Sequence, residues 1–220
     1  MPLALVTGAN RGIGLELCRQ LIARGFEVIG TSRGAAPRLE RLGARVERLE
    51  VTDPASVTAL AERLRGGPPL DLLINNAGLL VRDDLDHIDP AALRAQFDTN
   101  AVGPIVLTAA LVPLLSPGAK VAVITSRMGS IADNTSGGAY GYRMSKAALN
   151  AGAASLAFDL RERGIAVGIL HPGYVKTDMT EGRGFITADE SARGLLDRID
   201  ELTPATTGTF RHMNGEELPW

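Results

Sequence analysis

The chain has 220 residues, of which 45% are hydrophobic and only 4% aromatic, which predicts a domain with an aliphatic core. The net charge of −2 is dispersed, which excludes a basic nucleic-acid-binding stripe, and the single cysteine, Cys18, excludes an internal disulfide. The N-terminus turns polar at Thr7, and the apolar stretch 101–115, which contains no charged residue, falls short of a bilayer span. We therefore expect a cytoplasmic protein with no signal peptide and no membrane partner.

Strand and helix patterns alternate along the chain. An apolar run at 3–7 precedes an amphipathic helix in which Ile13, Leu17 and Leu21 repeat, and this helix ends at Arg24-Gly25. A capping residue followed by proline marks two later helix starts, at 53–54 and 89–90, and a capping box marks another at 187–190. Further strands are predicted at 26–31, 45–51, 70–75, 120–125, 165–170 and 208–213. Further helices are predicted at 37–42, 54 to about 66, 90 to about 115, 140–163 and from 187 onward.

This alternation predicts an α/β fold. The predicted strands are continuous apolar runs, which is typical of a parallel sheet covered by helices on both faces. No composition shift or internal repeat divides the chain. We therefore predict one doubly wound Rossmann domain over residues 1–220, with about seven strands.

A glycine-rich turn separates the first strand from the first helix. Its sequence is Thr7-Gly8-Ala9-Asn10-Arg11-Gly12-Ile13-Gly14. Glycines allow close backbone approach, and a helix N-terminus offers unpaired N–H groups to a pyrophosphate. Any tight strand-to-helix turn also favours glycine, but the place after the first strand of an alternating chain favours a dinucleotide site. The predicted cofactor-binding residues are Gly8, Asn10, Arg11, Gly12, Ile13 and Gly14.

The residue that reads the adenosine ribose is expected about 20 residues further on, at the end of the second strand. The sequence there is Thr31-Ser32-Arg33, with no carboxylate until Glu40. Arg33 and Arg11 would together bind a 2′-phosphate, whereas an acid would repel it. The alternative is that both are ordinary solvated arginines. The pattern favours NADP(H), with NAD(H) as the alternative cofactor.

Tyr142 and Lys146 are four residues apart and share one face of the helix predicted at 140–163. A phenol has a pKa of about 10, and a nearby ammonium, the helix N-terminus and a cationic nicotinamide would each favour phenolate. Such a pair would supply a general acid/base. The same spacing also occurs by chance as an exposed helix pair.

Taken together, these motifs resemble the short-chain dehydrogenase/reductase family. The glycine turn, Asn75-Asn76-Ala77-Gly78, Asn100, Ser126, the Tyr142–Lys146 pair and Pro172-Gly173 follow the family's order and spacing from residue 1 to about 180. The short chain, the segments 142–150 and 171–179 and the ending 214–220 resemble sniffer-like and C-factor-like carbonyl reductases. The resemblance implies hydride transfer between a nicotinamide and a small carbonyl or alcohol substrate.

The resemblance also implies residue roles. Ser126 would donate to the substrate oxygen, Tyr142 would protonate it, and Lys146 would hold the nicotinamide ribose and lower the tyrosine's pKa. Asn100 would kink its helix and hold a water leading from Lys146 to solvent. The remaining implied cofactor contacts are Ser32, Arg33, Asp53 at the adenine edge, Asn75, Ala77, Gly78, Pro172, Gly173, and Val175 with Thr177 at the carboxamide.

Two departures from the family pattern leave alternatives open. Sixteen residues separate Ser126 from Tyr142, which is longer than the common spacing, so Ser130 and Ser136 are alternative partners for the tyrosine. The region between Thr177 and Thr187 is brief, so the lid that relatives place over the substrate is either absent here or replaced by other loops.

Two other functions fit parts of the same pattern. A nucleotide-binding signalling protein of the same fold would need no complete Asn–Ser–Tyr–Lys set, and a sugar epimerase would need a larger C-terminal domain. The three histidines are scattered and predict no metal site. Small residues at 147–154 fit a homodimer or homotetramer through paired long helices, and equally fit burial within one chain.

Overall fold

Seven strands form one parallel sheet in the computed structural model, which describes all 220 residues. Its order is β3-β2-β1-β4-β5-β6-β7, and every neighbouring pair is parallel. The predicted doubly wound fold is confirmed. The strands are β1 (Leu3–Val6), β2 (Glu27–Ser32), β3 (Arg45–Arg48), β4 (Leu70–Asn75), β5 (Leu115–Ile124), β6 (Ala166–His171) and β7 (Phe210–His212).

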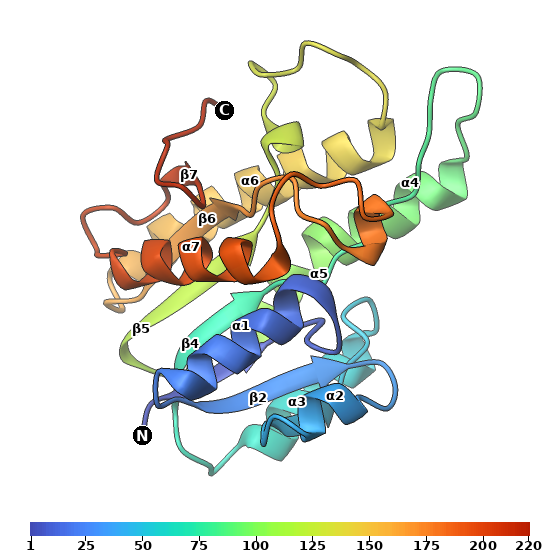
Figure 1. Cartoon of the computed structure of the whole chain (residues 1–220). Coiled ribbons are helices and arrows are strands. Elements are labelled where there is room, and N and C mark those ends of the chain that lie inside the picture. Colours follow the sequence, from blue (N-terminus) through green and yellow to red (C-terminus); the bar gives the residue numbers. More distant parts are fainter.

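Helices cover both faces of this sheet, and α1 lies beside α7 on one of them (Figure 1). On the other face α3 packs against α5, and α5 against α6. The helices are α1 (Gly12–Ala23), α2 (Pro37–Glu40), α3 (Pro54–Leu64), α4 (Pro90–Phe97), α5 (Gly103–Leu111), α6 (Tyr140–Arg161) and α7 (Ala188–Asp200).

The two covered faces explain why β1 is apolar at every position. Ala4 and Val6 belong to the hydrophobic cluster beneath α1 and α7, whereas Leu3 and Leu5 belong to the cluster beneath α3 and α5. Successive side chains of a strand point to opposite faces, so a strand covered on both sides must be apolar throughout.

The long helical region predicted at 90 to about 115 is divided by a widened turn. A π-helical turn at Asp98–Val102 joins α4 to α5, and a 3-10 turn at Val112–Leu114 ends the run. The run Pro90–Leu114 is long and apolar enough, by length and composition alone, to cross a membrane. Leu107 and Leu111 are fully buried against the sheet, so packing within the domain accounts for their apolar character.

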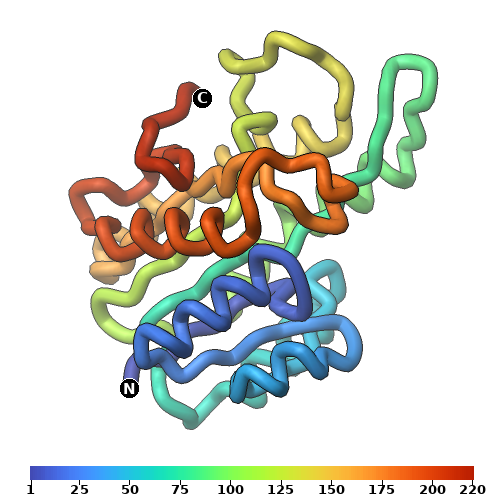
Figure 2. The backbone as a smooth tube through the Cα atoms, viewed as in Figure 1, coloured from blue at the N-terminus to red at the C-terminus, as the bar shows by residue number.

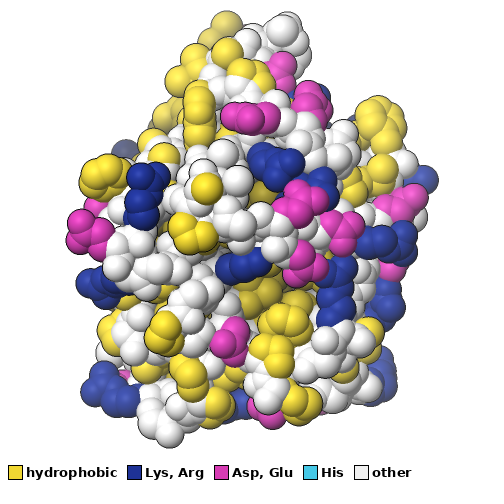
Figure 3. Space-filling model, turned by 90° about the vertical axis from the view of Figure 1, so that its left-hand side faces the viewer, with side chains coloured by type: hydrophobic (Ala, Val, Ile, Leu, Met, Phe, Trp, Pro, Cys, Tyr) yellow, Lys and Arg dark blue, Asp and Glu magenta, His cyan; other side chains and the backbone are white.

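Two strand boundaries differ from the predicted ones by three residues or more. β3 ends at Arg48, three residues early, because the chain leaves the sheet edge there. β5 starts at Leu115, five residues early, because Leu70 of β4 pairs with Leu115 before the register shifts and Leu72 pairs with Lys120. Acidic and basic side chains are interspersed on the face shown in Figure 3, with no extended patch of one sign.

The carboxyl ends of the parallel strands meet at one edge of the sheet, where ligand sites of this fold class lie. The glycine turn follows β1, Asn76 follows β4, Ser126 follows β5 and Pro172 follows β6. Three loops extend from this edge, at 79–89, 127–139 and 172–187 (Figure 2). The fold thereby brings the motifs named above to one place.

Candidate active site

A cavity of about 450 Å³ opens at this edge of the sheet. It extends from the glycine turn and the end of β2, across the end of β4, to Tyr142 and Lys146 on α6. Of the residues expected to bind cofactor, those that line it are Gly8, Asn10, Arg11, Gly12, Ile13, Gly14, Ser32, Arg33, Ala77, Gly78, Tyr142, Lys146, Pro172 and Thr177.

The glycine turn has the geometry that a pyrophosphate requires. A Cβ on Gly14 would lie 2.4 Å from the carbonyl oxygen of Gly8, and Gly8 itself has a φ of +62°. No side chain caps the N-terminus of α1 and no acid lies in its first turn. The first N–H groups of α1 are therefore available to a bound anion, so the residues present fit a dinucleotide.

Asn76, rather than Asn75, forms the wall of the cavity after β4. Its side-chain amide donates to the carbonyl oxygens of Thr7 (2.9 Å) and Gly8 (3.3 Å), which ties the glycine turn to β4. Asn75 points to the other side of the strand and donates to the Thr108 hydroxyl at 3.0 Å. The expected place of Asn75 on the adenosine side is thus corrected by strand alternation, whereas Asn76 of the same motif, which the resemblance also placed on that side, does line the pocket.

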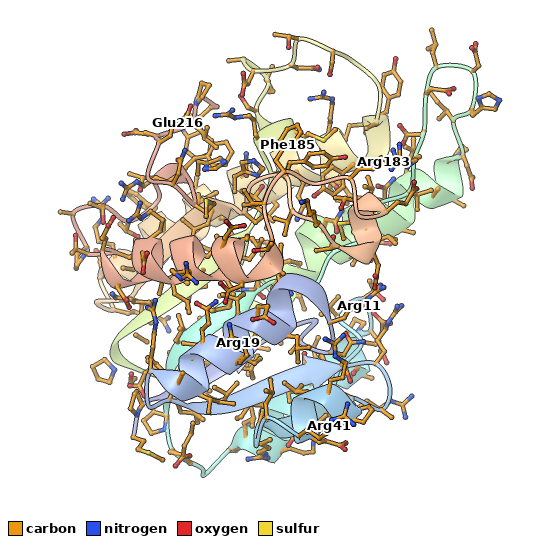
Figure 4. All side chains as sticks on the ribbon, viewed as in Figure 1. Arg11, Arg19, Arg41, Arg183, Phe185 and Glu216 are labelled. Atoms are coloured by element: carbon orange, nitrogen blue, oxygen red, sulfur yellow. The ribbon has the colours of Figure 1, made fainter.

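Both arginines at the adenosine end have acidic partners. Arg11 donates to Asp178 at 2.8 Å, and Arg33 lies 3.8 Å from Glu50. Their side chains remain 62% and 80% exposed. Figure 4 shows Arg11 at the N-terminal end of α1, below the segment that carries Arg183 and Phe185. Exposed ion pairs of this kind are weak, so each arginine can exchange its carboxylate for a phosphate.

Asp53, the residue expected at the adenine edge, lies outside the cavity. Its carboxylate accepts from the backbone N–H of Ala55 at 2.9 Å and caps α3. Glu50 and Val51 line the cavity instead, because β3 ends early and turns these residues toward it. The sequence pattern correctly predicted the Asp53-Pro54 helix cap. The contact of the Asp53 carboxylate with the adenine edge, which the family resemblance implied, is not supported.

Tyr142 and Lys146 lie one helical turn apart at the inner end of the cavity. The Lys146 ammonium donates to the carbonyl oxygen of Ile124 at 2.8 Å and lies 5.7 Å from the centre of the Tyr142 ring. Ser126 accepts from the N–H of Met128 at 3.1 Å, which leaves its hydroxyl proton free to donate. The side chain of Ser126 is also close enough to the Tyr142 phenol to lower the pKa of that phenol.

Burial dominates the titration of this pair. It raises the pKa of Tyr142 to about 12, against the opposing effect of the Ser126 hydrogen bond, and it lowers the pKa of Lys146 to about 7. The expected lowering of the phenol pKa by the ammonium is therefore outweighed in this structure. A phenol that keeps its proton at neutral pH is suited to donate it.

Asn100 is fully buried behind the cavity, inside the π-helical turn. Its amide accepts from the N–H of Leu79 and donates to the carbonyl oxygen of Leu79, both at 2.7 Å. It also donates to the hydroxyl of Ser145 at 3.0 Å. The widened turn is the kink expected there, and Asn100 connects it to the residue before Lys146.

The two alternative serines have other partners. Ser130 accepts from the N–H of Asp133 at 3.0 Å, and Ser136 accepts from Arg143 at 2.9 Å on an exposed part of the loop. Of the three serines, only Ser126 acts on the pKa of Tyr142.

Residues 172–187 fold into a short flap. The N–H of Phe185 donates to the carbonyl oxygen of Tyr174 at 2.7 Å, and their rings lie 5.3 Å apart.

Val175, which was expected at the carboxamide, is buried and pairs with Ile186. Neither Val175 nor Gly173 lines the cavity. Phe185 is 84% exposed and does not line the cavity. Asp178 and Met179 line the cavity and were missed, because only the folded flap brings them there.

His171 makes folding sensitive to acid. Burial lowers its pKa to about 3, whereas the unfolded chain has a histidine pKa of about 6.5. Between these pH values the unfolded chain binds a proton that the folded chain does not, so stability falls as pH falls from 6.5. Because of His171, the free energy of unfolding of the wild type should fall by up to about 2 kcal/mol between pH 7 and pH 5. We expect this part of the fall to be absent in His171→Gln. Urea unfolding at both pH values measures this, and equal losses in variant and wild type would contradict it.

Comparison with known proteins places this site in a family. The family model for short chain dehydrogenases matches residues 2–184. The chain is 42% identical to 1-hydroxy-2-glutathionyl-2-methyl-3-butene dehydrogenase of Rhodococcus sp. strain AD45, with both chains covered completely. It is 48% identical to C-signal of Myxococcus xanthus over 155 residues, which cover 69% of this chain and 93% of C-signal.

Solved structures agree with these sequence matches. NADPH-bound carbonyl reductase from chicken fatty liver has a TM-score of 0.91 at 35% identity, and carbonyl reductase Sniffer of D. melanogaster a TM-score of 0.95 at 31% identity. Both comparisons cover all of each chain. The chain therefore belongs to the short-chain dehydrogenase/reductase family and is an NAD(P)-dependent oxidoreductase acting on a CH–OH or C=O group.

Proposed function

We propose that the protein reduces small carbonyl compounds with NADPH and that Tyr142 donates the proton. The observation that carries this proposal is that Tyr142 and Lys146 line one end of a cavity whose other end is the uncapped N-terminus of α1, and that the side chain of Ser126 acts on the Tyr142 phenol. The similar carbonyl reductase from chicken fatty liver binds NADPH, which supports the choice of cofactor.

The residues of this chain have separate tasks in that reaction. The N–H groups at the start of α1 would hold the pyrophosphate, and Lys146 would hold the ribose next to the nicotinamide. NADPH, when bound, supplies the hydride. Ser126 would donate to the substrate oxygen and stabilise the negative charge that develops on it, and Tyr142 would then transfer its proton to that oxygen.

The exposed flap supports a permissive choice of carbonyl substrate. Its two aromatic rings, Tyr174 and Phe185, are exposed and neither lines the cavity. Exposed apolar side chains on α5 and α6, among them Val106 and Phe158, support self-association as a homodimer or homotetramer. Light scattering of the purified protein measures that state.

A screen of aldehydes, ketones and quinones tests the proposed reaction. With NADPH we expect loss of absorbance at the reduced-nicotinamide band for several compounds, and slower loss with NADH. Cofactor binding without turnover of any compound would instead favour the second candidate, a nucleotide-binding signalling protein. The identity with C-signal is the observation that keeps this candidate in view.

Cofactor choice leads to a separate prediction about Arg33. Losing one charge-assisted contact costs about 1.5–3 kcal/mol, so Arg33→Ala should weaken NADPH binding by about one to two decades and leave NADH nearly unchanged. Arg41→Ala is the matched control, since Arg41 is the residue that follows α2 and does not line the cavity. Titration of both cofactors measures the effect. A wild type that prefers NADH, or a variant that loses both cofactors equally, would refute the phosphate contact.

A further inference from the structure

Residues 79–83, here named the strap, connect the end of β4 to the helices around the active site. Asn100 holds both backbone groups of Leu79, as described above. The side chain of Gln96 on α4 accepts from the N–H of Val81 at 3.0 Å. Arg82 donates to Glu181 of the flap at 3.3 Å. The strap is therefore fixed along most of its length before it reaches Asp83.

Asp83 makes three contacts with the start of α6. Its carboxylate accepts from the backbone N–H groups of Tyr140 and of Gly141, the second at 2.9 Å. Its carbonyl oxygen accepts from the N–H of Ala139 at 3.1 Å. These are the N–H groups that a helix leaves unpaired at its first turn.

The helix has no cap of its own. The residue before it, Ala139, has a φ of +49° and no side chain able to accept from the helix. Helices are normally capped by the side chain of the preceding residue. In α6 the capping carboxylate belongs instead to Asp83, which is 57 residues away from Tyr140 in the sequence.

The opposite side of the same turn is closed by Gln96. A Cβ on Gly141 would lie 2.3 Å from the Gln96 amide nitrogen and 3.0 Å from the Asp83 carboxylate. Gly141 is thus held between two side chains that leave no room for one of its own. Tyr142 is the next residue, so the first turn of α6 and the phenol are positioned together.

We propose that Asp83 is a positioning residue that holds Tyr142 in place by capping α6 from the strap. Its effect is confined to the first turn, because the second turn has other anchors. Ser145 is held by Asn100, and Lys146 by the carbonyl oxygen of Ile124. Loss of the cap therefore displaces the phenol more than the ammonium.

This inference rests on the proposed function, in which Tyr142 donates the proton and Lys146 holds the cofactor. We expect Asp83→Ala to lower kcat by about ten- to one-hundred-fold, the scale of a small misplacement of a reacting group. The Kd for NADPH should stay within about twofold of wild type. Asp83→Asn should recover only part of the activity, because the asparagine oxygen can accept from one of the two N–H groups whereas its NH2 group would face the other.

Asp84→Ala is the matched control. Asp84 is the next aspartate, and its carboxylate accepts only within its own loop, from the N–H of Asp86 and the ring of His87. This variant should keep wild-type kcat. An Asp83→Ala enzyme with unchanged kcat, or one whose NADPH affinity falls in parallel with kcat, would overturn the proposal.

Amide hydrogen exchange tests the cap without reference to activity. In Asp83→Ala the amides of Tyr140 and Gly141 should exchange about tenfold faster, while that of Leu149 in the middle of α6 is unchanged. If wild type reduced no carbonyl compound, the proposed function would fail and the exchange rates would still decide whether Asp83 caps the helix. Equal exchange in variant and wild type would overturn the cap itself.

Discussion

Tyr142→Phe is expected to lower turnover by about 10²–10⁴-fold, the usual contribution of a positioned acid/base, while cofactor affinity stays unchanged. The substitution removes one hydroxyl and keeps the ring that lies beside Lys146. Because the phenol has a raised pKa of about 12, it carries its proton throughout the neutral range. It can therefore donate this proton to the oxygen of the carbonyl group that is reduced.

Single-turnover kinetics with NADPH already bound would measure this loss apart from binding and product release. Tyr140→Phe is the matched control, because Tyr140 lies one residue before Gly141 on the same turn and does not line the cavity. Near-full activity of Tyr142→Phe would reject Tyr142 as the proton donor. An equal loss of NADPH affinity would assign the hydroxyl to cofactor binding instead.

Ser126→Ala is expected to lower turnover by about 10²–10³-fold, the scale of one lost donor to a developing negative charge. Ser126 lies two residues after the end of strand β5, and its hydroxyl proton is not used by the loop. The substrate oxygen would lose one of its two hydrogen-bond partners, so kcat should fall more than the affinity for substrate.

Ser130→Ala provides a closely matched control for this variant. Each serine accepts one loop N–H, from Met128 for Ser126 and from Asp133 for Ser130, so both variants lose one such bond. Only Ser126 also acts on the pKa of the Tyr142 phenol. If Ser130→Ala or Ser136→Ala were the damaging change, the longer loop would have moved the reacting serine and our assignment would fail.

The sequence alone was sufficient for features that depend on near neighbours. Alternating strand and helix patterns predicted the doubly wound sheet, because burial of both faces imposes an apolar residue at each strand position. The glycine spacing predicted the turn after β1, since close approach and positive φ restrict the residue type locally. The four-residue spacing of Tyr142 and Lys146 placed both on one helix face, and the i,i+4 geometry of α6 keeps them there.

The tertiary structure alone decided what depends on distant neighbours. Strand alternation turned Asn75 toward Thr108 and left Asn76 facing the glycine turn, and the strand pattern by itself did not show on which side the glycine turn would lie. The early end of β3 brought Glu50 to the cavity, while Asp53 stayed at its helix cap. Asp83 meets α6 only because the strap crosses between two elements far apart in the sequence. Local patterns restrict backbone conformation and burial, whereas the partner of a polar side chain depends on which loops the completed sheet brings together.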